Sequence, residues 1–385
     1  MTLYGNALPD FPWDTLKADR DRAAQYPSGE VDLTIGSPVD PVPQIARDAL
    51  VASADSHAYP PNVGTGEWRR AVRSWLREVA GAIAPVDFLP TLGEKEMVAL
   101  LVALLGIGQG QRVGFPNIAY PTYEVGARLA GAEPVAIDVE TDPEGWPADL
   151  ALLWLNSPSN PTGHVLSEAQ LARIVRWARE HQVIVASDEC YSALVWDVES
   201  APSVLSEGVC GEDASGLLML YSLSKQSNLA GYRAAFIAGD PELIAQLRET
   251  RKHAGFMMPG MVQHVMSVVL ADREHVREQA HKYQERRETL LAALPAAGLV
   301  NDPDSVAGLY LWVHAGDGEG TDAPTAWELV HAFAELGIVV APGTFYGPAG
   351  EGHVRISLTA SDQDIRDAAK RLPAFSAALA RVRGR

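Results

Sequence analysis

The sequence predicts an α/β fold with a mostly parallel central sheet in a large domain, accompanied by a smaller α+β domain. Six short runs rich in valine, isoleucine and leucine recur between residues 112 and 240, with amphipathic helical patterns between several of them. Continuous apolar runs are typical of strands buried on both faces, and the succession strand, helix, strand builds a parallel sheet covered by helices. From about residue 261 the sequence changes to long charged amphipathic stretches followed by two short apolar runs.

The apolar runs give the expected strands in chain order: RVGFP at 112–116, PVAID at 134–138, ALLWLN at 151–156, QVIVASDE at 182–189, LLMLYSLS at 217–224 and AAFIAGD at 234–240. Residues 167–181 (SEAQLARIVRWAREH) predict a helix, and Ser167 is a suitable N-cap because its hydroxyl can accept a hydrogen bond from the first turn. A long helix at 271–294 and short strands at 308–315 and 353–359 are expected in the second domain.

These elements imply three segments of the chain. Residues 1–44 are a proline-rich arm that contains GSP and DPVP, and we expect this arm to wrap across surfaces and to form part of the small domain. Residues 45–272 are expected to form the large domain. Residues 273–385 are expected to form the small C-terminal domain.

Composition and charge exclude several classes of function. The chain has 385 residues, 31 of them Lys or Arg and 49 Asp or Glu, and its formal net charge of −18 predicts no nucleic-acid partner. We expect no membrane contact and no export, because the N-terminus does not resemble a signal peptide and no apolar run reaches 18 residues. Two cysteines are too few for a disulfide framework, so a cytoplasmic location is expected. No His, Cys and carboxylate spacing indicates a metal site.

Polar residues follow four of the predicted strands, which is where ligands bind in open α/β sheets. The segments are NIAYPTY, NSPSNPTG, DECY and SKQSN. Lys225 follows its strand directly, and an amine removed from water there becomes a nucleophile that can form a Schiff base. Ser222, Ser224 and Arg233 supply hydroxyls and a planar cation suited to a phosphate. A loop lysine taken alone is usually a solvated charge, but the strand before it and the arginine after it favour the chemical role.

Taken together, these motifs resemble those of the class I and II aminotransferases of fold type I, which depend on pyridoxal 5′-phosphate. The S-x-S-K motif that ends at Lys225, with an arginine eight residues later, matches the family's cofactor-lysine motif. SNPTG matches its asparagine loop, and DEC-Y matches its aspartate and tyrosine. Matching segments run from GSP near residue 36 to RIS near residue 355. The resemblance implies an aminotransferase in which Lys225 is the catalytic residue and residues 45–272 bind the cofactor.

The resemblance also implies which residues surround the cofactor's ring. Asp188 would keep the pyridine nitrogen protonated, which makes the ring an electron sink. Asn160 and Tyr191 would hydrogen-bond the ring's 3′-oxygen, and Tyr120 would stack on the ring. Each residue also has an ordinary structural role, since a carboxylate at a strand end can form a surface pair and Asn, Pro and Gly are common in turns.

The cofactor's phosphate would be bound at the start of a helix. By the resemblance, the backbone amides of Glu94 and Lys95, which follow Gly93, lie at a helix N-terminus that favours an anion. The family usually has a small or hydroxyl residue beside this glycine, so we expect the Glu94 side chain to point away. The other implied phosphate ligands are Ser222, Ser224, Arg233 and, across the interface of a homodimer, Tyr59.

Substrate binding is implied at three further positions. Arg355 matches the arginine that binds the substrate's α-carboxylate through two parallel hydrogen bonds. Gly36 matches a loop glycine whose backbone closes over the substrate, and Asn160 is expected to contact the substrate as well as the cofactor. The fullest local match, from LPDFPWDTL through SLSKQSNLAGYR, is to the N-succinyldiaminopimelate aminotransferases of lysine and diaminopimelate biosynthesis. Glutamate would then donate the amino group and N-succinyl-2-amino-6-oxopimelate would accept it, with residues 251–253 (RKH) as a candidate source of further cations.

Several alternatives stay open at this point. Other aminotransferases of the family act on aspartate, alanine or aromatic amino acids, and the shared cofactor residues do not discriminate among them. A pyridoxal-phosphate-dependent β-lyase would use the same lysine, but would release pyruvate and ammonia from one amino acid without a keto acceptor. A non-enzymatic regulator with an aminotransferase-like domain would carry a basic helix-turn-helix extension, which we do not expect here.

Overall fold

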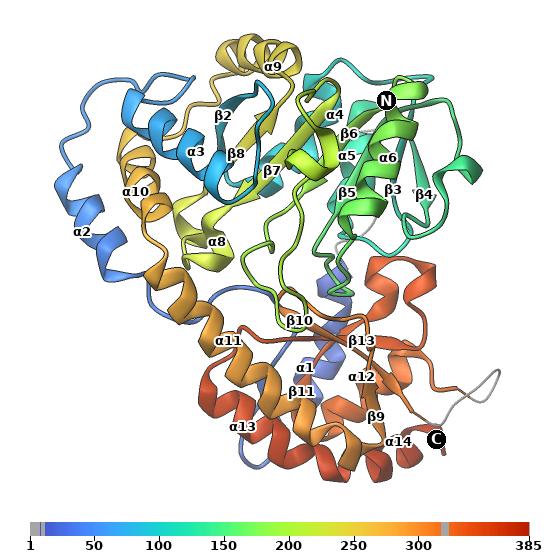
Figure 1. Cartoon of the computed structure of the whole chain (residues 1–385). Coiled ribbons are helices and arrows are strands. Elements are labelled where there is room, and N and C mark those ends of the chain that lie inside the picture. The colour runs from blue at the N-terminus through green and yellow to red at the C-terminus, as the bar shows by residue number, and fades with distance from the viewer. Residues whose placement is uncertain (1–7, 9–11, 317–322, 385) are drawn as a thin grey trace, which may run out of the picture.

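A seven-stranded sheet forms the centre of the upper part of the molecule in Figure 1. The computed structural model of the chain describes residue 8 and residues 12–316 and 323–384. The strand order is β2-β8-β7-β6-β5-β3-β4. The strands are β2 (Asp87–Leu92), β3 (Arg112–Pro116), β4 (Glu133–Ile137), β5 (Leu150–Asn156), β6 (Ile184–Asp188), β7 (Leu217–Ser222) and β8 (Ala234–Gly239). Neighbouring strands from β7 to β4 are parallel, and β8 is antiparallel to both of its neighbours, so the predicted mostly parallel sheet is confirmed.

The six predicted strands all form within two residues of their expected ends. β2 is a seventh strand that the apolar runs did not predict. Its sequence DFLPTL contains Pro90, which lacks an N–H group and argues against a strand inside a sheet. β2 lies at the sheet edge beside β8, where Pro90 is opposite Phe236. A proline is tolerated there because one side of an edge strand makes no ladder hydrogen bonds.

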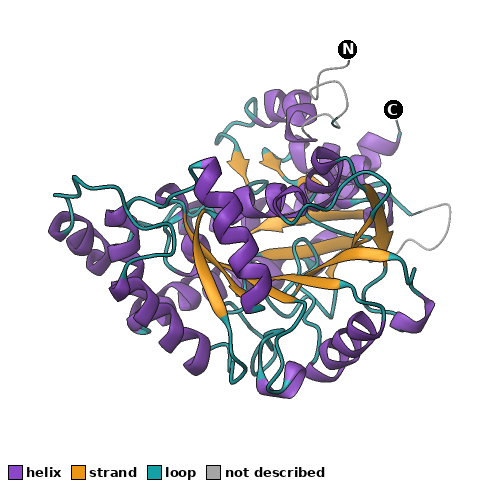
Figure 2. Cartoon of the chain, turned by 90° about the horizontal axis from the view of Figure 1, so that it is seen from above, coloured by secondary structure: helices purple, strands orange, loops and turns teal. Residues whose placement is uncertain are grey.

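Helices cover both faces of this sheet (Figure 2). On one face Leu153, Leu217 and Tyr221 belong to a core shared with α2, α3, α6 and α10, and on the other face Trp154 and Leu218 belong to a core shared with α4, α5 and α9. Consecutive residues of one strand therefore enter different cores, which explains the continuous apolar runs. The helices are α2 (Gln44–Ala52), α3 (Gly66–Glu78), α4 (Glu94–Leu104), α5 (Thr122–Ala130), α6 (Glu168–Glu180), α9 (Pro241–Ala254) and α10 (Gly260–Ala271), with the short α7 (Glu207–Cys210) and α8 (Leu223–Gln226).

The predicted helix at 167–181 is α6, and it begins as the sequence predicts. Ser167 Oγ accepts a hydrogen bond from the Gln170 N–H (3.3 Å), and Gln170 Oε1 accepts one from the Ser167 N–H (2.9 Å). This capping box satisfies amide groups that have no partner inside the helix.

The lower part of the molecule in Figure 1 is built on two smaller sheets. One has four antiparallel strands in the order β12-β13-β10-β9, and in the other β1 pairs in parallel with β11. The strands are β1 (Val31–Asp32), β9 (Leu299–Asn301), β10 (Tyr310–Ala315), β11 (Ile338–Val339), β12 (Ala341–Pro342) and β13 (His353–Ser357), and the helices are α1 (Lys17–Ala23), α11 (Glu274–Ala293), α12 (Ala326–Glu335), α13 (Asp362–Arg371) and α14 (Phe375–Arg383). A separate core that contains Leu311, Phe333 and Ile356 supports this part, and its predicted α+β character is confirmed.

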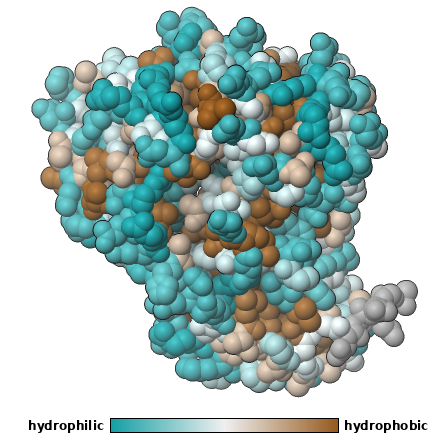
Figure 3. Space-filling model, viewed as in Figure 1, coloured by the Kyte–Doolittle hydropathy of each residue, from teal (hydrophilic) through white to brown (hydrophobic). Residues whose placement is uncertain are grey.

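The two parts are joined at the junction of α10 and α11. α10 packs against α2 and α3 of the upper part, whereas α11 packs against α13 of the lower part. We therefore propose the division that the sequence predicts, with residues 45–272 as the large domain, 273–385 as the small domain and 1–44 as an arm. In the space-filling view, hydrophobic residues gather where the upper and lower parts meet (Figure 3).

The structure describes residue 8 and the ranges 12–316 and 323–384. Within these ranges, no helix combines the length and the apolar character that a bilayer crossing requires. Residues 1–7 and 9–11 of the predicted arm lie outside the described residues.

Candidate active site

A cavity of about 370 Å³ lies at the carboxyl ends of β5, β6 and β7. It is lined by Trp13, Ile35, Gly36, Ser37, Glu94, Lys95, Val98, Tyr120, Tyr123, Asn156, Asn160, Asp188, Cys190, Tyr191, Ser222, Ser224, Lys225, Ala230, Arg233, Tyr310 and Arg355. Segments from the arm, the large sheet and the small sheet therefore meet around one space. The structure brings most of the residues singled out in the sequence together here.

Lys225 lies in α8, directly after β7. β7 ends at Ser222, whose Oγ accepts a hydrogen bond from the Ser224 N–H (3.2 Å) and donates one to Ser224 Oγ (2.8 Å). This turn at the strand end directs the half-buried Lys225 into the cavity, where its Nζ donates a hydrogen bond to the carbonyl oxygen of Gly36. The amine thus faces the loop that the resemblance assigns to substrate closure.

Asp188 is the last residue of β6, and its carboxylate is buried. Its Oδ2 accepts a hydrogen bond from the Tyr123 hydroxyl (2.8 Å), and its Oδ1 accepts one from the Cys190 N–H (3.2 Å). Burial and then the Asp188 charge raise the pKa of Tyr123 well above its usual value, so this hydroxyl stays protonated and donates. Tyr123 is a site residue that the sequence reasoning missed, although it lies only three residues after Tyr120 in the same motif.

The start of α4 forms one end of the cavity. Gly93 precedes the helix with φ +75°, and its N–H donates to the Arg233 carbonyl oxygen (2.8 Å). A Cβ at Gly93 would lie 2.1 Å from an Arg233 terminal nitrogen, so only glycine allows this approach. The N-terminal amides of α4, from Glu94 and Lys95, and the Arg233 guanidinium therefore form a cradle suited to an anion.

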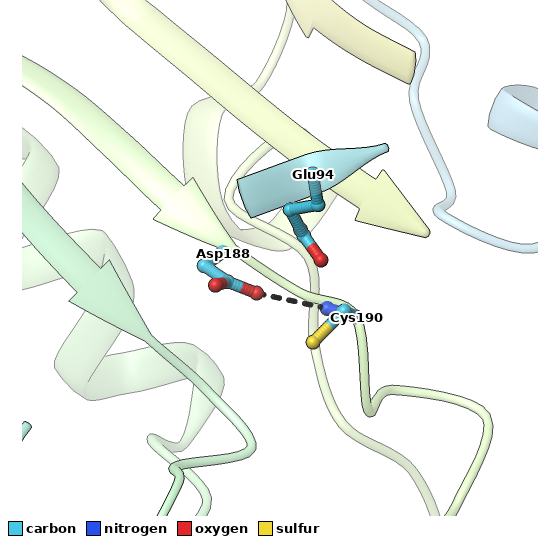
Figure 4. A group of neighbouring side chains, drawn as sticks. All are labelled: Glu94, Asp188 and Cys190. Atoms are coloured by element: carbon cyan, nitrogen blue, oxygen red, sulfur yellow. Dashed lines mark hydrogen bonds between the residues drawn. The ribbon is translucent and has the colours of Figure 1, made fainter. Parts of the chain in front are cut away.

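The side chain of Glu94 does not point away from the cavity, and this expectation was wrong. Glu94 lines the cavity, and its carboxyl oxygen, an Asp188 oxygen and Cys190 Sγ lie within 4.8 Å of one another (Figure 4). The other acid of this turn, Glu96, forms an ion pair with Arg251 (2.8 Å). Residues two apart lie on opposite sides of a helix, so Glu94 faces inward when Glu96 faces Arg251.

Arg355 comes from β13 of the small sheet and is buried. One terminal nitrogen donates to Asn160 Oδ1 (2.8 Å), the other donates to the Thr34 carbonyl oxygen, and the guanidinium lies 3.8 Å from the centre of the Tyr310 ring. Its Nε is buried without a hydrogen-bond partner among the described residues. Such an unsatisfied donor on the cavity wall fits a bound carboxylate.

Asn160 is held in place by the end of β5. Asn156 Oδ1 accepts a hydrogen bond from the Asn160 N–H (2.8 Å), and Asn156 Nδ2 donates to the Asp188 carbonyl oxygen (3.0 Å). The loop that carries Asn160 is thereby tied to the strand that carries Asp188. Tyr191 lines the same side of the cavity, with its hydroxyl 3.3 Å from that of Tyr310.

Some predicted residues lie elsewhere. Tyr59 is 91% exposed and is not among the described residues that line the cavity, so its reach across a dimer interface stays a prediction. The described lining also contains none of residues 251–253: Arg251 is paired with Glu96, and Lys252 lies near Glu249 (3.6 Å) at the surface. These cations do not extend the site within one chain.

Two histidines near the site, His275 and His164, make polar contacts that were not predicted. Ser227 Oγ lies 2.8 Å from His275 Nε2, and His275 Nδ1 lies 2.6 Å from Asp272 Oδ2, which links the segment after Lys225 to the α10–α11 junction. Ser227 and His275 lie 48 positions apart, so the sequence gives no local signal for their contact. His164 lies between Glu140 (2.5 Å) and Asp302 (3.1 Å); burial opposes its charge, but these hydrogen bonds raise the pKa of His164 to about 10.

Comparison with known proteins identifies the same family as the sequence motifs do. Residues 28–372 match the family described as aminotransferase class I and II. The chain is 46% identical over 366 residues to the 4-dedimethylamino-4-oxo-anhydrotetracycline transaminase OxyQ of Streptomyces rimosus, covering 95% of this chain and 99% of OxyQ. It is 47% identical over 368 residues to the probable aminotransferase Rv1178 of Mycobacterium tuberculosis, covering 95% of this chain and 85% of that protein. A probable N-succinyldiaminopimelate aminotransferase from Thermus thermophilus superposes with a TM-score of 0.84 at 27% identity, covering 95% of this chain and 100% of the other.

Replacing Gly93 by alanine tests the anion cradle. The added Cβ displaces the Arg233 guanidinium, so we expect Gly93→Ala to weaken the binding of pyridoxal 5′-phosphate about tenfold or more, measured by equilibrium dialysis. Gly106→Ala is the matched control, since Gly106 has the same φ of +75° and a Cβ added there would have nothing within 4 Å. Both variants place a side chain at a positive φ, and at Gly93, where ψ is 170°, the backbone lies in a region that is essentially restricted to glycine. Equal cofactor affinities in the two variants would contradict the prediction that the start of α4 and Arg233 bind the phosphate.

Replacing Tyr123 by phenylalanine tests the support of Asp188. A hydrogen bond to a charged group contributes about 1.5–3 kcal/mol, so Tyr123→Phe is expected to lower kcat by roughly tenfold to a hundredfold. Tyr346→Phe is the control, because the buried Tyr346 hydroxyl has no hydrogen-bond partner among the described residues. The prediction fails if steady-state assays give both variants the same kcat.

Proposed function

The chain belongs to the class I and II aminotransferase family, and we propose that it transfers an amino group from glutamate to N-succinyl-2-amino-6-oxopimelate, in lysine and diaminopimelate biosynthesis. Enzymes of this family depend on pyridoxal 5′-phosphate and act on amino acids and 2-oxo acids. The observation that supports aminotransferase chemistry is that three groups line the same cavity. They are the amine of Lys225, the buried carboxylate of Asp188 and the buried guanidinium of Arg355.

The residues of the cavity fit this cofactor. The cradle at Gly93 would hold the phosphate, together with the hydroxyls of Ser222 and Ser224, and Asp188 would face the ring nitrogen. Tyr120 is half-buried on the cavity wall, where it would contact the ring. When bound, pyridoxal 5′-phosphate supplies an electron sink for the charge that develops at the substrate's α-carbon.

Lys225 is the side chain to which we assign the movement of protons. Its Nζ lies in the cavity beside Gly36, and an amine in that position can take a proton from the substrate's α-carbon as a general base and return it as a general acid. Asp188 is held in one orientation by Tyr123 and by the Cys190 N–H, so its carboxylate needs no rearrangement. The first product leaves before the second substrate binds, so we expect ping-pong kinetics.

Arg355 is the residue that we propose for the substrate's α-carboxylate. Contacts with Asn160, Thr34 and the Tyr310 ring fix the plane of its guanidinium, and its Nε remains available. A guanidinium fixed in this way selects a planar carboxylate. The carbonyl of Gly36 lies beside the same space, consistent with a backbone that closes over the substrate.

The choice of acceptor is supported by sequence and structural similarity. The local segments from LPDFPWDTL through SLSKQSNLAGYR resemble N-succinyldiaminopimelate aminotransferases, and a probable enzyme of that name superposes over 95% of the chain. A second acceptor class is favoured by the 46% identity to OxyQ, whose name places the ketone on an anhydrotetracycline. Trp13, Ile35 and Tyr310 give one wall of the cavity an apolar surface that suits such a ring system.

Assembly and location are also part of the proposal. We propose a homodimer in which Tyr59 reaches the partner's cavity, because Tyr59 and Val51 are large apolar side chains that are 91% and 76% exposed. A cytoplasmic location is supported by two cysteines that are both buried and free.

The proposed reaction is tested by mixing the purified protein, loaded with cofactor, with single amino acids and recording the cofactor's visible absorbance. Glutamate is expected to bleach the band and N-succinyl-2-amino-6-oxopimelate to restore it. Restoration only by a ring-borne ketone would favour the OxyQ-like alternative. Release of pyruvate and ammonia from one amino acid would favour a β-lyase, and an unchanged band with glutamate would exclude the proposed donor.

Replacing Lys225 by alanine tests the catalytic amine. We expect Lys225→Ala to abolish turnover, because it removes the amine that donates to the Gly36 carbonyl oxygen, and borohydride reduction should no longer attach the cofactor to the peptide that contains residue 225. Lys252→Ala is the control, since the Lys252 side chain is 61% exposed and lies outside the described cavity lining. A Lys225→Ala variant with normal turnover and visible absorbance would refute the assignment.

A further inference from the structure

Glu94 is an acidic residue in the cavity that the proposed reaction does not use. Its Oε1 is buried and has no hydrogen-bond partner in the described part of the chain. Figure 4 shows its side chain extending toward Asp188 and Cys190, and the three polar atoms lie within 4.8 Å of one another. A carboxyl group that has a buried oxygen without a donor, beside a second carboxylate, is costly to keep ionised.

The Glu94 side chain begins at the end of the cavity that suits a phosphate. Glu94 is the first residue of α4, directly after Gly93, whose backbone touches Arg233. Its carboxyl group lies near Asp188, at the end that suits a ring nitrogen. The side chain therefore lies between the two groups that the cofactor must contact together.

We propose that Glu94 competes with the cofactor for its own site: the Glu94 carboxyl group must lose its charge or turn out of the cavity before pyridoxal 5′-phosphate binds tightly. The inference rests on the cofactor assigned under the proposed function, and it does not depend on the identity of the substrates. The proposal concerns the acidic side chain that directly follows Gly93 at the anion cradle.

The groups around Glu94 make this competition depend on pH. The titratable groups that face it are Asp188 at the end of β6, Cys190 in the next loop, Lys225 in α8, Tyr123 in α5 and Tyr221 in β7. Burial and then the Asp188 charge raise the pKa of Glu94 well above its usual value. Glu94 is therefore neutral at low pH and becomes charged as the pH rises through this raised pKa. An ionised carboxylate in this cavity repels the anionic cofactor, so cofactor affinity is expected to fall over the same range.

The test compares the dissociation constant of pyridoxal 5′-phosphate for the cofactor-free full-length protein and for Glu94→Gln, at pH 7 and pH 9, by equilibrium dialysis. The phosphate, whose second pKa is about 6, is mainly a dianion at both values, so its titration contributes little. At pH 9 we expect Glu94→Gln to bind pyridoxal 5′-phosphate at least about tenfold more tightly than the unmodified protein does. We also expect the cofactor affinity of this variant to change less between the two pH values.

Glu189→Gln is the matched control. Glu189 is also a buried acid beside Asp188, and burial raises its pKa to about 7, but it lies outside the described cavity lining. It accepts a hydrogen bond from the Val204 N–H (2.8 Å), which a glutamine oxygen can still accept. We expect Glu189→Gln to keep the pH dependence of the unmodified protein. The proposal is overturned if Glu94→Gln binds no more tightly at pH 9, or if Glu189→Gln alone removes the pH dependence.

Thermal unfolding of the cofactor-free protein gives a second readout. An acid whose pKa is raised in the folded state costs folding stability as the pH rises from its unfolded pKa to its folded pKa, and the cost persists above that range. Glu94→Gln should therefore melt at a higher temperature than the unmodified protein at pH 9, and a lower temperature would contradict the buried charge. A wrong choice of amino donor or acceptor would alter neither measurement.

Discussion

The parallel pairing of β5, β6 and β7 is the constraint on which the site depends. The register places Asn156 opposite Asp188 and Asp188 opposite Leu220. Parallel neighbours end at the same edge of a sheet and lie about 4.8 Å apart, so the loop after β5, the end of β6 and the turn after β7 must meet. Asn160, Asp188 and Lys225 become neighbours for this reason, and each is then fixed by hydrogen bonds to strand ends or adjoining backbone.

The sequence could predict the strands that are apolar on both faces, because each carries its own signal in a continuous run. It could not predict β2, where Pro90 breaks the pattern and only pairing with β8 defines the strand. β1 is two residues long, too short for any periodicity, and its partner β11 begins at Ile338. Elements that depend on distant partners leave little local signal, whereas the cap of α6 is local and was predicted from Ser167.

The site also combines features that have a local sequence signal with features that depend on distant residues. Motif residues could be predicted from their places after the apolar strands and from the resemblance to the family, but the groups that orient them could not. Tyr123 reaches Asp188 across 65 positions, and Thr34 reaches Arg355 across 321. The orientation of the Glu94 side chain also depends on a residue that is distant in the sequence. Arg251 pairs with Glu96 on one side of α4, and the helical geometry then turns Glu94 toward the cavity.

The two parts of the molecule contribute different functions to the cavity. The large sheet supplies Lys225, Asp188 and the anion cradle, whereas the small sheet and the arm supply Arg355, Trp13 and Ile35. The residues that we propose for the cofactor are therefore separate from most of those that can contact the rest of a substrate. Relatives can keep the first set and change the second, so a 46% identical transaminase and a 27% identical structural neighbour can bear names with different acceptors. Trp13 and Ile35 belong to the part of the cavity lining that the arm supplies, so we expect substitutions there to change acceptor preference before they change cofactor binding.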